Sequence, residues 1–140
     1  MNCPPGRCAL FILALSLAAG STRADVVAVV SSTSAFTTLS KAQVTDIFLG
    51  IVSRFPDGTL AIPIDQADGS PARDEFYATY AGKSPAQVKS HWAKIIFTGR
   101  GQPPKAVPTN VEVRRIVAAN PQSIGYIERS AVDSTVKVVL

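Results

Sequence analysis

The stretch LAIPIDQADGSPARDEFY (Leu60–Tyr77) decides how this chain is organised, because it contains the signals of a strand, a tight turn and a helix in direct succession. The apolar run LAIPI predicts a short buried strand. The dipeptide Asp68-Gly69 is a turn signal, and Ser70 followed by Pro71 is typical of a helix start. The stretch therefore predicts a strand that turns directly into a helix.

Two interpretations fit the residues around Ser70. In the first, Ser70 only caps the helix, Pro71 fixes its first turn and the side chain of Arg73 is solvated. In the second, the Ser70 hydroxyl and the backbone N–H groups of Ala72 and Arg73 hold an oxyanion, and the Arg73 guanidinium closes over it. Both interpretations use the same residues, so local chemistry leaves the choice open.

The rest of the chain alternates between strand and helix signals. VVAVV (Val26–Val30) is a continuous β-branched run, as expected of a strand that is covered on both faces. Further strands are predicted for SIGYI and VKVVL near the C-terminus. Helices are predicted from Lys41 to Gly50, from Pro71 to Gly82, from Pro85 to Phe97, and from Thr109 or Asn110 to Asn120. This order predicts a single α/β domain around a mixed β-sheet flanked by helices.

Two positions carry sharper expectations. Pro63 cannot donate a ladder hydrogen bond, so its strand should lie at a sheet edge or be irregular there. Trp92 shares a helical face with Val88, Ile95 and Ile96, so we expect it to pack in the core and not to serve as a ligand platform. The segment TGRGQPPKAVP, which follows that helix, is predicted to be a long irregular loop.

The N-terminus has the pattern of a secretory signal. A short basic lead, an apolar run that ends at Gly20, and Ala24 before Asp25 predict a signal peptide over residues 1–24 and a domain over residues 25–140. An uncleaved membrane anchor is the alternative. Both cysteines, Cys3 and Cys8, lie in the leader, so the mature protein is expected to contain no disulfide. Cleavage of the signal predicts a protein that is periplasmic or secreted, with no membrane insertion.

The charge pattern argues against nucleic acid as a partner. Arg7 and Arg23 lie in the leader, so its removal lowers the formal net charge from +4 to +2. The pair Arg114-Arg115 is the only adjacent basic pair, and aromatic residues do not alternate with basic ones.

Signals of catalysis are poor. His91 is the only histidine, and no cysteine remains after the leader to act as a nucleophile. Asp65 and Asp68 are too few for an oxygen-ligand metal site, and Asp68 is better explained as a turn former. Arg100 lies in a Gly- and Pro-rich segment that is favoured to be a plain surface loop, although it could reach a ligand or partner. We therefore expect a protein that is not an enzyme and uses no cofactor or metal.

Three segments together resemble the substrate-binding proteins of phosphate ABC transporters. LSKAQVTDIFLG is similar to a family helix of the form L-x-x-x-Q-L-x-x-I-F-x-G. IPIDQADGSPARDEF is similar to the family's strand and phosphate loop, R-x-D/E-G-S-G-T-x-x-x-F. NPQSIGYIERSAV is similar to P-G-A-I-G-Y-V-x-x-x-x-A. They occur in family order, and the match runs from about Val26 to the C-terminus.

The resemblance implies a periplasmic-binding-protein-like fold and an anion ligand. Family members are two-lobed and hold the anion between their lobes, whereas the match covers a single lobe. Where the family pattern has Arg, Ser, Gly and Thr, this chain has Gln66, Ser70, Pro71 and Ala72, so only Ser70 carries over directly. The residues expected at the ligand are Asp68, Gly69, Ser70, Ala72 and Arg73.

We therefore expect an exported, non-catalytic protein that binds phosphate or a similar oxyanion around Ser70. Binding would be weak or would depend on a second subunit, either an envelope protein or a second copy in a homodimer. The alternative is an envelope interaction or sensing module in which the anion site is vestigial.

Overall fold

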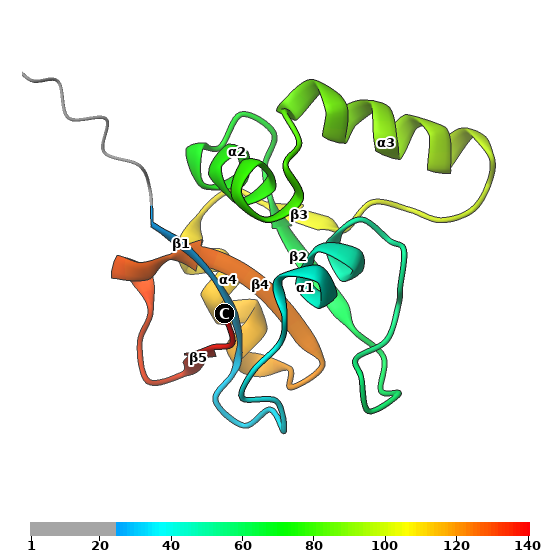
Figure 1. Ribbon diagram of the computed structural model, residues 1–140. Helices are drawn as coiled ribbons and strands as arrows, with labels where there is room; N and C mark the ends of the chain where they lie inside the picture. The colour runs from blue at the N-terminus through cyan, green and yellow to red at the C-terminus, as the bar shows by residue number, and fades with distance from the viewer. Residues whose placement is uncertain (1–24) are drawn as a thin grey trace, which may run out of the picture.

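The computed structural model describes residues 25–140, and the predicted signal peptide lies outside this range. Five strands form one sheet in the order β3-β2-β4-β1-β5 (Figure 1). The strands are β1 (Val26–Ser31), β2 (Ile62–Gln66), β3 (Lys105–Val107), β4 (Ser123–Glu128) and β5 (Val136–Val138). The helices are α1 (Lys41–Phe48), α2 (Pro71–Phe76), the π-helical turn η1 (Tyr77–Ala81), α3 (Pro85–Phe97), α4 (Asn110–Ala119) and the 3₁₀ turn η2 (Arg129–Ala131).

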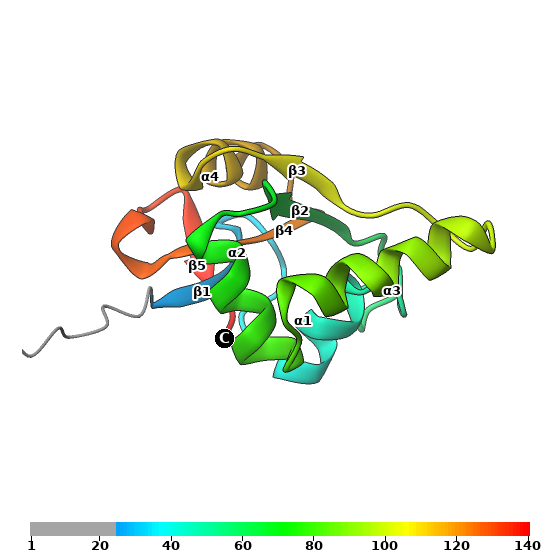
Figure 2. The same cartoon turned by 90° about the horizontal axis from the view of Figure 1, so that it is seen from above.

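The sheet is mixed, as predicted. β2 runs parallel to both β3 and β4, whereas β1 runs antiparallel to both β4 and β5. Helices cover both faces: Figure 2 shows α4 on one side of the sheet and α1, α2 and α3 on the other. The chain therefore forms a three-layer α/β/α domain, which confirms the predicted fold class.

The β-branched run of β1 serves both faces of the sheet. Val26, Ala28 and Val30 belong to the core under α1, α2 and α3, whereas Val27 and Val29 belong to the core under α4. All six residues of β1 are buried. Because alternate side chains of a strand point to opposite faces, a strand covered on both sides must be apolar throughout.

Each α-helix begins after a serine or threonine whose hydroxyl caps its first turn. Ser40, Ser70, Ser84 and Thr109 each accept a hydrogen bond from the backbone N–H three residues later. Thr109 is therefore the cap of α4 and Asn110 its first residue, which settles the alternative that the sequence left open. The helix predicted from Pro71 to Gly82 changes to a π-helical turn after Phe76 and ends at Gly82, whose φ is 62°.

Two details of the strands differ from expectation. β2 is an interior strand, so the first of the two alternatives given for Pro63, a sheet edge, is wrong. The backbone N–H of Ile62 donates to the oxygen of Gln122, towards β4, so the nitrogen of the next residue, Pro63, faces the β3 side. Pairing with β3 begins only at Ile64, so no hydrogen bond is lost at Pro63. The predicted irregular loop also contains β3, a strand of three residues whose shortness leaves little periodic signal.

The inward face of α3 was predicted in part. Val88 and Trp92 are buried, with 1% and 7% of their surfaces exposed, but Ile96 is 48% exposed. The outer end of α3 therefore extends beyond the core. Within residues 25–140, no helix is long and apolar enough to cross a membrane.

Candidate functional site

The predicted site residues lie at one edge of the sheet. β2 and β3 are parallel, so their carboxyl ends meet at the same edge, where the chain turns into α2 and α4 respectively. In open α/β sheets, ligands bind outside the carboxyl ends of the strands. The predicted residues from Asp68 to Arg73 belong to the first of these turns.

Ser70 caps α2 and also contacts the end of β2. Its Oγ accepts from the backbone N–H of Arg73 at 3.4 Å and donates to Oε1 of Gln66 at 2.9 Å. The turn before it is closed by the backbone N–H of Ser70, which donates to the oxygen of Ala67 at 3.0 Å. Gly69 has a φ of 84°, a left-handed conformation that glycine adopts without steric cost.

Three backbone donors of this turn remain available. In the described part of the chain, no hydrogen bond uses the backbone N–H groups of Asp68, Gly69 or Ala72. Asp68 and Gly69 are exposed, whereas Ala72 is buried. Successive backbone N–H groups in a turn can hold an anion. The turn thus has two exposed amides without a partner within residues 25–140, at Asp68 and Gly69, beside a Ser70 hydroxyl whose proton is donated to Gln66.

Arg73 points towards the end of the sheet. Its Nη1 donates to the backbone oxygen of Gln66 at 3.0 Å and lies 3.5 Å from Oδ2 of Asp65. The guanidinium carbon also lies 5.5 Å from the centre of the Tyr77 ring. The side chain is only 17% exposed. Its charge therefore already has an intramolecular partner.

Asp65 is the centre of a buried polar cluster that sequence reasoning missed. Its carboxylate accepts from the hydroxyl of Tyr77 at 2.7 Å, from the hydroxyl of Tyr126 and from the backbone N–H of Gln66 at 2.8 Å. Burial raises the pKa of both tyrosines, and the negative charge of Asp65 raises it further. Both hydroxyls therefore stay protonated and donate to Asp65 at neutral pH.

Gln66 occupies the position where the family pattern has arginine, and its amide is used within the domain. Nε2 donates to Oδ1 of Asn110 at 2.8 Å and to the backbone oxygen of Tyr126 at 3.2 Å. Its Oε1 accepts from Ser70. Gln66 thus joins the start of α2 to the start of α4 without adding a positive charge.

The other candidate residues of the sequence analysis lie away from this turn or have structural partners. Nε2 of His91 lies 2.7 Å from the backbone oxygen of Leu49, so it joins α3 to the end of α1. Arg100 lies in an exposed segment after α3. Within residues 25–140, no group of three or more His, Cys, Asp or Glu side chains is placed to hold a metal ion.

No family model and no curated protein matches the sequence. Solved structures do match the fold. One is a protein from Clostridium perfringens assigned as a phosphate ABC transporter substrate-binding protein, solved with bound phosphate, with a TM-score of 0.66 and 19% identity over 82% of this chain and 44% of that chain. An ABC-type phosphate transport receptor from Vibrio cholerae has a TM-score of 0.65 and 18% identity over 82% of this chain and 45% of that one.

The chain spans less than half of the length of these two structures. At these identities the likeness concerns the fold, and it agrees with the resemblance drawn from the three sequence motifs. This chain therefore has the fold of one lobe of a phosphate ABC transporter substrate-binding protein.

Proposed function

We propose that the protein is a non-catalytic solute-binding protein that holds phosphate, or a similar oxyanion, at the turn between β2 and α2. The observation that carries the proposal is the set of unused amides at Asp68, Gly69 and Ala72 beside the Ser70 hydroxyl. With the predicted signal peptide, the protein would act in the periplasm or after secretion.

The chemistry of the turn suits an oxyanion better than a neutral solute. Backbone N–H groups donate hydrogen bonds, and the Ser70 hydroxyl would donate to the ligand in place of its bond to Gln66. A tetrahedral oxyanion offers several acceptor oxygens to these donors. The position at the carboxyl end of β2 is where ligands bind in this class of sheet. Among structures with the same fold, one contains bound phosphate and another is a phosphate transport receptor, which supports phosphate as the first candidate.

Binding by this lobe alone should be weak. Pro71 has no N–H, Ala72 has no hydroxyl, and Gln66 stands where the family pattern has arginine. A charge-assisted hydrogen bond contributes about 1.5–3 kcal/mol, so the two donors missing at Pro71 and Ala72 alone weaken binding by roughly two to four powers of ten. The charge of Arg73 is also offset by Asp65. A second subunit, an envelope protein or another copy of this chain, would supply the missing donors.

Calorimetric titration of the purified protein with phosphate and with sulfate tests the proposal. We expect a saturable signal with a Kd of roughly micromolar to millimolar, which Ser70→Ala abolishes. Ser84→Ala is the matched control, because Ser84 caps α3 in the same way but lies outside the turn. Nanomolar binding by a monomer, or binding that survives Ser70→Ala, would contradict the proposed site.

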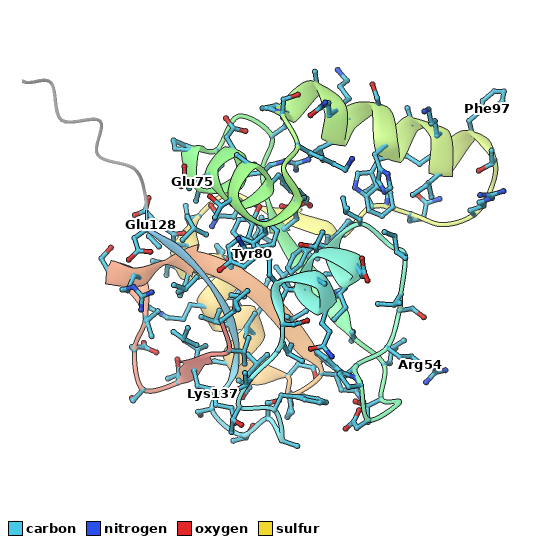
Figure 3. The ribbon with its side chains drawn as sticks, viewed as in Figure 1. Arg54, Glu75, Tyr80, Phe97, Glu128 and Lys137 are labelled. Atoms are coloured by element: carbon cyan, nitrogen blue, oxygen red, sulfur yellow. The ribbon has the colours of Figure 1, made fainter. Side chains whose placement is uncertain are left out.

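The second candidate is an interaction or sensing module for another envelope protein. The pairing of Arg73 with Asp65 favours it, because the cation nearest the turn is already neutralised. Phe97 favours it too, since this side chain is 92% exposed and points away from the body of the domain at the outer end of α3 (Figure 3). This candidate would be favoured over phosphate binding if neither phosphate nor sulfate gave a binding signal in calorimetry. It would also require that the protein form a stoichiometric complex with another envelope protein and that Phe97→Ser abolish this complex.

A further inference from the structure

A hollow outside the Ser70 turn is lined by Trp92. It has a volume of about 380 Å³ and lies between α1, β2, α3 and the segment 100–105 that returns from α3 to the sheet. Its walls are mainly apolar and include Ile47, Val52, Ile62, Trp92, Ile95 and Pro103. None of the five predicted anion-site residues lines it. We call this hollow the Trp92 groove.

The groove has a basic rim. Arg100 and Lys105 both line it, and no acidic residue of the described chain does. Neither cation takes part in an ion pair among residues 25–140. The whole segment 83–105 contains five basic residues and no acidic one, so nothing nearby in the sequence offsets their charge. An occupant with a negative group would complement this rim.

Trp92 also has an unsatisfied donor, which is itself buried and therefore not exposed to the groove. Trp92 is 7% exposed, and its Nε1 is the one buried side-chain nitrogen or oxygen in the described part of the chain that lacks a hydrogen-bond partner. An unpaired buried donor costs free energy, so such groups are rare and call for an explanation. Gly50 packs closely on the six-membered ring of the same side chain, since a Cβ there would lie 2.8 Å from its Cη2 atom.

We propose that the Trp92 groove binds a small organic anion that has an apolar, preferably aromatic, body and one carboxylate or sulfonate group. The volume lies within the range of small-molecule sites, about 300–1,000 Å³, and such sites are largely apolar with a few placed polar groups. The apolar body would lie against Ile62, Ile95 and Pro103, and the anionic group would pair with Arg100 and Lys105. Inorganic phosphate does not fit this chemistry, because it has no apolar surface to cover the walls.

Trp92 is the only tryptophan of the chain, so its fluorescence reports on the groove directly. The probe is 4-phenylbutyrate, compared with the neutral 4-phenylbutan-1-ol and with acetate. We expect a saturable change with phenylbutyrate, binding of the alcohol that is weaker by about tenfold, and no saturable change with acetate. Calorimetry with the same probes checks the affinities independently.

Variants of the rim identify the site. Arg100→Gln and Lys105→Gln should each weaken phenylbutyrate binding by about fivefold to tenfold. Both positions are exposed, so folding is preserved. Lys94→Gln is the matched control, because it removes the same charge from α3 but does not line the groove. Ser70→Ala should leave phenylbutyrate binding unchanged, which separates this site from the proposed phosphate site.

Three results would overturn the proposal: no saturable signal with phenylbutyrate, equal affinity for the alcohol, or equal weakening by Lys94→Gln and Arg100→Gln. The last result would indicate a general charge effect without a site. Because phosphate binding and phenylbutyrate binding are measured with separate ligands and separate variants, either proposal can fail while the other stands.

Discussion

Nη1 of Arg73 lies 3.5 Å from Oδ2 of Asp65, and the same Nη1 donates to the backbone oxygen of Gln66. The carboxylate is almost completely buried, with 2% of the side chain exposed. The cation that sequence analysis assigned to an external anion is thus held by an internal one. This pair separates the two proposed functions, because an oxyanion at the turn must compete with Asp65 for Arg73.

Replacing Asp65 by asparagine should therefore strengthen phosphate binding. Asp65→Asn removes the internal negative charge while keeping an oxygen that can accept from the tyrosines, so the charge of Arg73 becomes available to the ligand. We expect affinity for phosphate to rise by about tenfold, measured by calorimetry. Asp68→Asn is the control, since it removes an exposed carboxylate from the same turn. Unchanged affinity in Asp65→Asn would show that Arg73 does not act at the site.

The tyrosines around Asp65 predict how stability depends on pH. Burial raises the pKa of Tyr77, Tyr80 and Tyr126, the three tyrosines of the chain, above the ordinary value of about 10. Above about pH 10 the unfolded chain loses phenolic protons that the native state keeps, so the free energy of unfolding should fall as pH rises further. Below that pH the tyrosines should contribute no pH dependence.

Absorbance at 295 nm, followed together with circular dichroism, checks this prediction. We expect phenolate absorbance to appear above the ordinary midpoint and to coincide with loss of the folded signal. Ionisation of all three tyrosines near pH 10 with the folded spectrum retained would contradict the assigned burial.

Trp92→Ala should strongly destabilise the domain. Its side chain packs in the core with α1 and α2, and truncation of a buried aromatic costs about 3–5 kcal/mol. Chemical denaturation measures the loss. Ile96→Ala on the same helix is the comparison, because Ile96 is 48% exposed and should cost much less. Equal losses in the two variants would mean that Trp92 is not a core residue.

Gly125 is required by the close approach of α4 to β4. A Cβ at this position would lie 2.5 Å from Cγ1 of Val113 and 3.0 Å from Cγ2 of Val117. Gly125→Ala should therefore lower the free energy of unfolding by about 1–3 kcal/mol. Gly101→Ala provides a contrast, since its Cβ would meet only Cγ2 of Ile95, at 3.6 Å, and its effect should be below about 0.5 kcal/mol. A neutral Gly125→Ala would show that α4 can move away without cost.

Mass spectrometry of the exported protein tests the predicted signal peptide. We expect a first residue of Asp25 and the loss of both cysteines, which lie in the leader. A mature protein that retains Cys8 would contradict this prediction.

The sequence by itself determined the local elements. The helices that start at Lys41 and Pro85 begin where predicted, and Thr109 is one of the two starts left open for the last helix. A cap and the N–H group that donates to it are three residues apart, so they form without help from distant parts of the chain. The apolar run of β1 likewise indicated burial on both faces. These signals, with the three ordered motifs, were enough to predict one α/β lobe.

Only the tertiary structure decided what the site residues contact. Tyr126 reaches Asp65 across 61 residues of chain, and Gln66 reaches Asn110 across 44. The strand order puts β3 beside β2, and β3 pairs with β2 only from Ile64 onward, so Pro63 has no neighbour on that side. No local pattern in the sequence predicted this order. The sequence left the partner of Arg73 undetermined for the same reason. The fold buries the carboxylate of Asp65 beside the hydroxyls of two tyrosines, and a buried charge needs a partner, which Arg73 supplies.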